Sequence, residues 1–182
     1  MRVIAGIARS LPLKAPEGLD TRPTTDRIKE TLFNILQGDI QGSVFVDLFS
    51  GSGAIGIEAL SRGAKKAYFV DNSPKSIDCI QQNLVFTKLS DRAIVIKQDV
   101  FSALHSIYEK EIDILFMDPP YAGGYEPQVF EVLKSMRNIT SDTLIVAEAS
   151  LHTDFSFLDE MGFTVMKDKQ YKTNRHLFIK RA

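Results

Sequence analysis

Four consecutive residues, Asp118-Pro119-Pro120-Tyr121, have a composition suited to holding an amino group. Proline has no backbone N–H, so this stretch presents mainly acceptors, the Asp118 carboxylate and the Pro119 carbonyl. Such acceptors can bind both hydrogens of an exocyclic base amine and direct its lone pair at an electrophile. The Tyr121 ring offers a flat face on which a nucleic-acid base can stack. The alternative interpretation is a rigid turn with a packing tyrosine.

A glycine-rich turn follows the first apolar run and matches G-x-G-x-x-G at Gly51, Gly53 and Gly56. Glycines let the backbone approach a ligand closely, and the helix that follows offers free amides. Dinucleotides and S-adenosylmethionine can both use this arrangement. Asp47 favours S-adenosylmethionine, because a carboxylate repels a pyrophosphate but attracts the ammonium group of a methionine moiety. A helix or loop cap is the alternative for Asp47. We expect Ser50 to belong to the same cofactor site.

Two further acids follow the next two apolar runs. Asp71, with Asn72 beside it, is placed to accept hydrogen bonds from ribose hydroxyls, as an acid at this position does in dinucleotide sites. Asp99 could accept from an adenine amino group, with the Val100 amide donating to a ring nitrogen. Each acid could instead cap the helix that follows it. Because carboxyl ends of parallel strands share one edge, these acids together predict one cofactor crevice.

Short apolar runs alternate with helical patterns through the middle of the chain, which predicts a parallel sheet covered on both faces. The expected strands are residues 44–48, 66–71, 93–97, 112–117 and 143–147. The expected helices are residues 54–62, 74–87, 100–108, 126–137 and, shorter, 154–161. The tail differs, because runs at 163–166 and 176–179 have no helix between them and should pair as an antiparallel hairpin.

The front of the chain is expected to form a separate small element. Residues 1–23 hold three prolines and two glycines and predict a hairpin or arm on the substrate side. Residues 24–182 would then form the main domain. A helix should begin at about Thr24, with Thr24 or Thr25 as its N-cap. Its buried face would carry Ile28, Leu32, Ile35 and Leu36.

Composition narrows the class of protein. The chain has 182 residues, of which 44% are hydrophobic, so it is expected to form one domain with a full core. No apolar run is long enough to span a bilayer and no signal peptide is visible, so we expect no membrane contact. The single cysteine, Cys79, excludes an internal disulfide and suits the cytoplasm. The net charge is −1, but residues 1–16 and 167–182 are basic, which suits either phosphate binding or surface solvation.

The tetrapeptide at 118–121 resembles the signature of class I amino-methyltransferases, [Asp/Asn/Ser]-Pro-Pro-[Tyr/Phe]. Further segments narrow the resemblance to the bacterial RsmD-type enzymes and extend it over essentially the whole chain. The segment around Thr21-Arg22-Pro23-Thr24 is the most specific part. The segments that carry the resemblance are Arg2–Gly6, Leu13–Pro16, Thr21–Arg27, Lys29–Asn34 and Asp47–Gly53.

The resemblance implies a Rossmann-like α/β fold with a seven-stranded, mostly parallel sheet, a C-terminal antiparallel hairpin and a small N-terminal hairpin. It implies methyl transfer from S-adenosylmethionine to the 2-amino group of a guanine in 16S ribosomal RNA. The partner would be that RNA or an assembling small ribosomal subunit, bound by a monomer. Arg22, Thr24 and Arg27 would border the cofactor and substrate entrance. The segment Tyr171–His176 lacks the glycine common in the corresponding turn of relatives.

Three other functions remain open at this point. An adenine 6-amino methyltransferase acting on DNA or RNA would use the same tetrapeptide, although no inserted target-recognition domain is visible. A non-catalytic RNA-binding protein would not need Asp47, Asp71 and Asp118. A nicotinamide oxidoreductase would have no use for the tetrapeptide. We expect no metal site, because His105, His152 and His176 are scattered without paired-ligand spacing.

Overall fold

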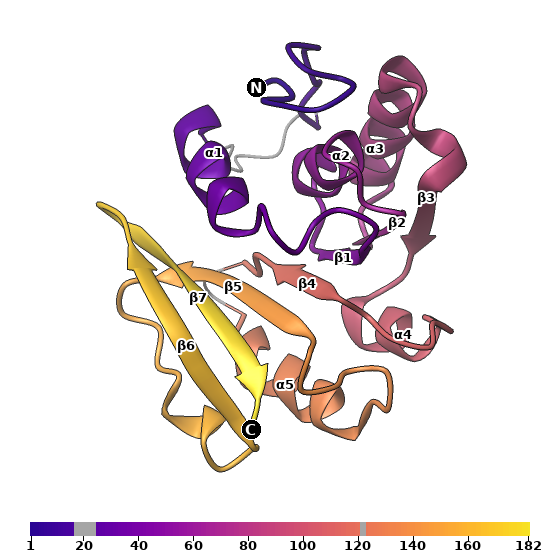
Figure 1. Cartoon of the computed structure of the whole chain (residues 1–182). Coiled ribbons are helices and arrows are strands. Elements are labelled where there is room, and N and C mark those ends of the chain that lie inside the picture. Colours follow the sequence, from indigo (N-terminus) through magenta and orange to yellow (C-terminus); the bar gives the residue numbers. More distant parts are fainter. Residues whose placement is uncertain (17–24, 121–122) are drawn as a thin grey trace.

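The computed structural model describes residues 1–16, 25–120 and 123–182. A seven-stranded sheet with the order β3-β2-β1-β4-β5-β7-β6 runs through the molecule (Figure 1). Strands β1 to β5 are parallel, and β7 pairs antiparallel with both β5 and β6. The predicted sheet and C-terminal hairpin are therefore confirmed. The strands are β1 Val44–Leu48, β2 Lys66–Asp71, β3 Ala93–Lys97, β4 Ile114–Met117, β5 Leu144–Ser150, β6 Phe163–Gln170 and β7 Asn174–Arg181.

Helices cover both faces of the sheet (Figure 1). One face carries α1 (Asp26–Ile35), α2 (Ala54–Ser61) and α3 (Pro74–Thr87), and the other carries α4 (Val100–His105) and α5 (Tyr125–Ser135). Helix α1 begins after Thr25, whose hydroxyl accepts from the Ile28 amide at 3.3 Å. Among the described residues, no helix is both long and apolar enough to cross a bilayer.

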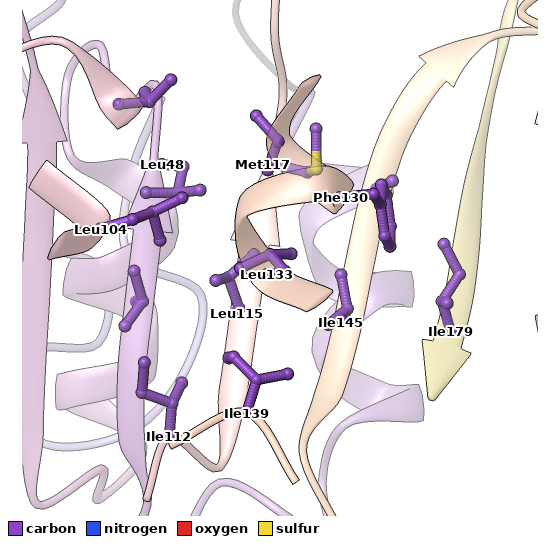
Figure 2. Close-up of a cluster of buried hydrophobic side chains, with 14 of the residues drawn as sticks. Leu48, Leu104, Ile112, Leu115, Met117, Phe130, Leu133, Ile139, Ile145 and Ile179 are labelled. Atoms are coloured by element: carbon purple, nitrogen blue, oxygen red, sulfur yellow. The ribbon is translucent and has the colours of Figure 1, made fainter. Parts of the chain in front are cut away.

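The hydrophobic core consists of two layers, because successive side chains of a buried strand point to opposite faces. In β1, Val46 and Leu48 pack on the α4–α5 side, whereas Phe45 packs on the α1–α3 side. Burial of each such side chain contributes roughly 1.5–3 kcal/mol. Figure 2 shows the α4–α5 layer, with strand and helix side chains facing each other at Leu48, Leu104, Leu115, Met117, Phe130, Leu133, Ile145 and Ile179.

The N-terminal segment folds back on itself and packs against the domain. The Val3 amide donates to the Leu11 carbonyl at 3.0 Å, and the Leu13 amide donates to the Met1 carbonyl at 3.1 Å. Val3, Ala8 and Leu13 are buried in the same apolar layer as α1 and α2. Residues 1–16 thus form the turned-back segment expected of an N-terminal hairpin, and its apolar side chains belong to the core of the domain. The remainder of the expected element, residues 17–23, lies outside the described residues.

Glu58, in α2, ties this segment to two helices, and we call its contacts the Glu58 clamp. Its two oxygens accept from the amides of Ile4 and Ala5 at 2.8 and 3.0 Å. The same carboxylate pairs with Lys29 at 3.4 Å and with Arg62 at 2.7 Å. Burial lowers the pKa of Lys29, while the nearby Glu58 charge opposes that shift. Lys29 also donates to the Arg2 carbonyl at 2.5 Å, which joins α1 to the N-terminal segment.

Some expected elements differ from the structure. The short helix expected at 154–161 is wrong, because this segment forms only a 3-10 turn, Ser156–Leu158. The Asp154 carboxylate accepts from the amide and hydroxyl of Ser156, both at 2.9 Å, which closes a tight turn. So short a segment also offers few bonds to offset the cost of starting an α-helix. Strands β6 and β7, each of 8 residues, are longer than expected, whereas α4 ends earlier, at His105.

Candidate active site

Four acids lie at the carboxyl edge of the parallel strands. The register pairs Asp47 of β1 with Phe69 of β2 and Phe116 of β4. Asp71 is the last residue of β2, Asp99 follows β3, and Asp118 follows β4. The structure therefore places the predicted acids of four neighbouring strands along one edge, where ligands bind in open α/β sheets.

The turn after β1 is fixed by hydrogen bonds and by close packing. The Ser50 hydroxyl donates to the Asp47 carbonyl at 2.6 Å and accepts from the Val70 amide at 2.9 Å. Gly53 has φ 76°, a conformation that side chains disfavour, and it is the N-cap of α2. A Cβ on Gly56 would lie 2.4 Å from the Phe69 ring. Helix α2 thus approaches the sheet closely, with its first amides at the same edge as the acids.

Asp47 is 1% exposed, and its Oδ2 accepts from the Gly56 amide at 3.0 Å. Burial raises the pKa of this carboxyl to about 7, the Gly56 hydrogen bond opposes that shift, and the Asp71 charge adds to it. One oxygen therefore stabilises the first turn of α2, as the capping alternative anticipated. Burial of the Asp47 carboxylate costs free energy, and a cation bound beside it would lower that free-energy cost.

Asp71 connects the glycine turn to the start of α3. Its Oδ2 accepts from the Gly51 amide and its Oδ1 accepts from the Ser73 amide, both at 2.9 Å. Ser73 is itself the N-cap of α3, so Asp71 is not the helix cap that the sequence left as an alternative. A carboxylate has about four acceptor positions, so each Asp71 oxygen can accept one more hydrogen bond. Asn72, next in the chain, is exposed at the same edge.

Asp99 is the N-cap of α4, as its capping alternative predicted. Its Oδ1 accepts from the amides of Phe101 and Ser102 at 3.1 and 3.0 Å. Hydrogen bonds from the Ser102 amide first, and from its side chain, lower the pKa of Asp99. Val100 is the first residue of α4, and amides of a first turn have no partner within the helix. Both Asp99 Oδ2 and the Val100 amide thus remain suitable for a ligand.

Asp118 directly follows β4 and is half-buried. Burial raises its pKa well above the ordinary value, and the charges of Glu148 and Asp47 raise it further. Pro119 is buried, while the Pro120 carbonyl accepts from the Gly123 amide at 3.1 Å and closes the turn. Asp118 consequently has a high affinity for a proton or for a hydrogen-bond donor. Tyr121 lies outside the described residues.

The predicted substrate residues are only partly covered by the described structure. Arg22 and Thr24 lie outside the described residues. Arg27 is exposed on α1, where its carbonyl accepts from the Thr31 hydroxyl at 2.9 Å. Within the described part of the chain, the Arg27 side chain forms no ion pair with the acids at the edge.

Sequence analysis missed two groups of residues near this edge. Three aromatic rings come together there. The centroid of the Tyr125 ring lies 5.2 Å from that of Phe49 and 6.3 Å from that of Phe101. Glu148 lies on β5, next to Asp118, among otherwise apolar residues. A lone glutamate within a buried apolar run is a signal that could have identified it, because charges are rarely buried without a purpose.

The strand order, the antiparallel β7 between β5 and β6, and the glycine turn after β1 together define a class I methyltransferase fold. The family can be stated as well: the chain belongs to the Conserved hypothetical protein 95 family, whose model matches residues 1–180. The resemblance deduced from the sequence is therefore confirmed.

Individual relatives match over most of their length. YlbH of Bacillus subtilis is 37% identical over 93% of this chain and 92% of that protein. The protein of Haemophilus influenzae named Ribosomal RNA small subunit methyltransferase D is 36% identical over 93% of this chain and 88% of its own. The YhhF structure from Escherichia coli superposes with a TM-score of 0.83 at 30% identity and covers 100% of this chain and 97% of that one.

Proposed function

We propose that this chain transfers a methyl group from S-adenosylmethionine to the 2-amino group of a guanine in small-subunit ribosomal RNA. One observation carries the proposal. Asp118 follows β4 at the same edge of the sheet as Asp47, Asp71 and Asp99 of the neighbouring strands, and burial together with the charges of Glu148 and Asp47 raises its pKa. A group of neighbouring carboxylates suits a cationic ligand, and Asp118 suits the hydrogens of an amine.

The residues at the edge fit S-adenosylmethionine by their chemistry. The Asp47 carboxylate, buried and raised in pKa, suits the ammonium group, and the confined acids suit the sulfonium charge. The spare acceptor positions of Asp71 suit the ribose hydroxyls, with Ser50, Gly51, Gly53 and Asn72 around them. Asp99 Oδ2 and the Val100 amide suit an adenine edge. In this arrangement the bound cofactor supplies an electrophilic methyl group.

The chain's own residues prepare the amine. Asp118 and the Pro119 carbonyl accept its two hydrogens, which orients the nitrogen lone pair and stabilises the positive charge that develops on nitrogen. Two successive prolines remove competing amide donors and keep the acceptors rigid. We propose that Tyr121 stacks on the base, a contact worth roughly 1–3 kcal/mol.

Guanine suits the site better than adenine does. Its Watson–Crick edge presents N1–H beside the 2-amino group, so two donors meet the acceptors, whereas adenine presents a bare N1 acceptor beside its amine. The tetrapeptide alone would serve either amine, but the Glu148 charge next to Asp118 favours the edge with more donors. The name of the Haemophilus influenzae relative supports small-subunit ribosomal RNA as the substrate.

The partner is proposed to be that RNA, free or in an assembling small subunit, met by a monomer in the cytoplasm. The basic residues of segments 1–16 and 167–182, with Arg22, Thr24 and Arg27, would contact phosphates near the site. Binding would then weaken steeply as salt concentration rises.

The proposal is tested with small subunits from a strain that lacks this protein, labelled with a radioactive methyl donor and digested to nucleosides. We expect the label in N2-methylguanosine with the wild-type chain and almost none with Asp118→Ala. Label in N6-methyladenosine would overturn the choice of base. Absence of label from both free RNA and subunits, with S-adenosylmethionine still bound, would overturn the proposed activity.

A further inference from the structure

A buried polar network lies behind Asp118, and it is separate from the predicted cofactor and substrate residues. Glu148 of β5 is 5% exposed, and its Oε1 accepts from Asn174 Nδ2 at 2.6 Å. Its Oε2 lies 3.0 Å from Nε2 of His176, which is 0% exposed. His176 Nδ1 lies 3.3 Å from the Tyr171 hydroxyl. Two residues at the start of β7, the second strand of the tail hairpin, thus hold the Glu148 carboxylate on both oxygens.

The sheet register brings this network against the methyl-transfer site. Met117 pairs with Ala147 in the parallel β4–β5 ladder, so Asp118 and Glu148 occupy the next positions along the two chains. The backbones of neighbouring strands lie about 5 Å apart. Glu148 in turn pairs with His176 across the β5–β7 ladder. The order along the sheet is therefore Asp118, Glu148, His176, with Tyr171 at the turn before β7.

The hydrogen-bond directions follow from the chemistry of each group. An ionised carboxylate only accepts, so Asn174 Nδ2 and His176 Nε2 donate to Glu148. The other ring nitrogen of His176, Nδ1, lies within hydrogen-bond distance of the Tyr171 hydroxyl. The basic side chains of this hairpin are directed elsewhere: Arg175 pairs with Asp168 and donates to the Thr153 carbonyl, and Lys169 lies over the Tyr171 ring. Of its two donors, the Asn174 amide carries no charge, and within the described residues neither a lysine nor an arginine pairs with Glu148.

Charged groups reach Asp118 from each neighbouring strand. Asp47 of β1 and Glu148 of β5 both raise its pKa, after burial as the main cause. The first turn of α5 carries a further buried acid, Glu126. Of these, Glu148 is the one whose orientation is fixed by two side-chain donors from the tail hairpin.

We propose that Glu148, oriented by Asn174 and His176, is a positioning residue of the methyl-transfer site that strengthens Asp118 as the acceptor of the amine proton. This role rests on the proposed function. In the step, an N–C bond replaces the C–S bond to the methyl group, an amine N–H bond breaks, and Asp118 gains that proton. The sulfonium charge disappears in the same step, so the Glu148 charge then acts on Asp118 without opposition.

The decisive variant is Glu148→Gln, which keeps the side-chain shape and an acceptor for Asn174. His176 can accommodate the new amide by changing its tautomer, so the fold should survive. We expect the Asp118 carboxyl, followed by carbon-13 NMR and assigned with Asp118→Asn, to titrate about one pH unit lower than in the wild-type chain. We expect kcat to fall roughly tenfold and the acidic limb of its pH profile to move to lower pH. The S-adenosylmethionine Kd should change less than threefold.

Two further variants separate this role from a structural one. His176→Phe removes a donor from Glu148 and should also lower the Asp118 midpoint, whereas His176→Gln retains a donor and should restore the wild-type value. Glu58→Gln changes another buried glutamate, whose contacts are two backbone amides and two cations, and it should lower thermal stability without moving the Asp118 midpoint.

The outcomes are distinct. An unchanged Asp118 midpoint in Glu148→Gln would overturn the inference, as would a kcat loss with no change in the pH profile. The NMR titration needs no RNA, so it decides the inference even if the chain methylates no ribosomal RNA. Conversely, normal labelling of guanine by Glu148→Gln, with an unmoved midpoint, would refute the inference and leave the proposed function intact.

Discussion

Two buried glutamates in this molecule have opposite surroundings. Glu58 is 0% exposed and meets two cations, Lys29 and Arg62, besides the amides of Ile4 and Ala5. Glu148 is 5% exposed and meets Asn174 and His176. In the Glu58 clamp the carboxylate charge is compensated by its own ion-pair partners, and its contacts join α1, α2 and the N-terminal segment. Glu148 has no lysine or arginine partner among the described residues, and in the role proposed above its oriented charge acts on its neighbour Asp118. Buried carboxylates of one type can thus be structural or electrostatic, depending on their donors.

The largest effect expected is from Asp118→Ala. Loss of the acceptor should lower kcat by at least roughly 100-fold and change the S-adenosylmethionine Kd only severalfold, because the contact is made mainly in the transition state. Adding Glu148→Gln to this variant should cost nothing further if Glu148 acts through Asp118. Single-turnover methylation and calorimetric binding measure both quantities. An additional tenfold loss in the double variant would show that Glu148 acts independently.

Substitutions in the Glu58 clamp should instead change the stability of the fold. Lys29→Met removes one cation from a buried pair, and we expect a loss of roughly 3 kcal/mol in the free energy of unfolding. Urea unfolding followed by circular dichroism measures this loss. The pH midpoint of kcat should stay where it is in the wild-type chain, and a shift comparable to that of Glu148→Gln would remove the contrast between the two glutamates.

Asp47 lies between these two cases, because its charge should be compensated only by a ligand. Its pKa is about 7 in the folded chain against an ordinary value of 3.8. The folded state thus holds a proton that the unfolded chain releases between about pH 4 and 7, and the stability of the free protein falls as pH rises through this window.

Replacement by Asp47→Asn should therefore stabilise the free protein at pH 8, by up to roughly 3–4 kcal/mol, and have little effect at pH 4. The same variant should bind S-adenosylmethionine at least roughly tenfold more weakly. Thermal melts at both pH values, with and without ligand, measure both effects. Equal stability changes at the two pH values would contradict the assigned burial cost.

The smallest effect separates the two roles of Asp99. Asp99→Ser keeps a good N-cap for α4, so stability should change by less than about 0.5 kcal/mol, while the S-adenosylmethionine Kd should rise severalfold. Asp99→Ala should lose the cap as well, at a cost of about 1 kcal/mol. If Asp99→Ser binds S-adenosylmethionine normally, Asp99 is a cap alone.

Periodicity and turn chemistry predicted most of the fold. The strands of the parallel sheet, the start of α1 after a threonine and the tail hairpin could all be deduced from local sequence, because each depends on nearby residues. The 3-10 turn at Ser156–Leu158 could not, since Asp154 decides it through side-chain hydrogen bonds that periodicity does not register.

The residues of the site also fall into those that the local sequence predicts and those that it does not. The acids after β1, β2, β3 and β4 were predictable because parallel strands end at one edge. The support of Glu148 by Asn174 and His176 was not, because it depends on the register between β5 and β7, 26 and 28 residues apart in sequence. The aromatic group around Tyr125 likewise requires three separate segments to meet, the turn after β1 and the first turns of α4 and α5.

The clamp at Glu58 also bears on how the chain could be shortened or rearranged. A protein trimmed to begin at residue 24 would lose Val3, Ala8 and Leu13 from the apolar layer and leave Glu58 without two of its amide donors. Grafting the first residues onto another scaffold would meet the same difficulty in reverse, because their shape is imposed by α2. The N-terminal hairpin is therefore part of the hydrophobic core, and we expect it not to keep its shape when it is separated from α2.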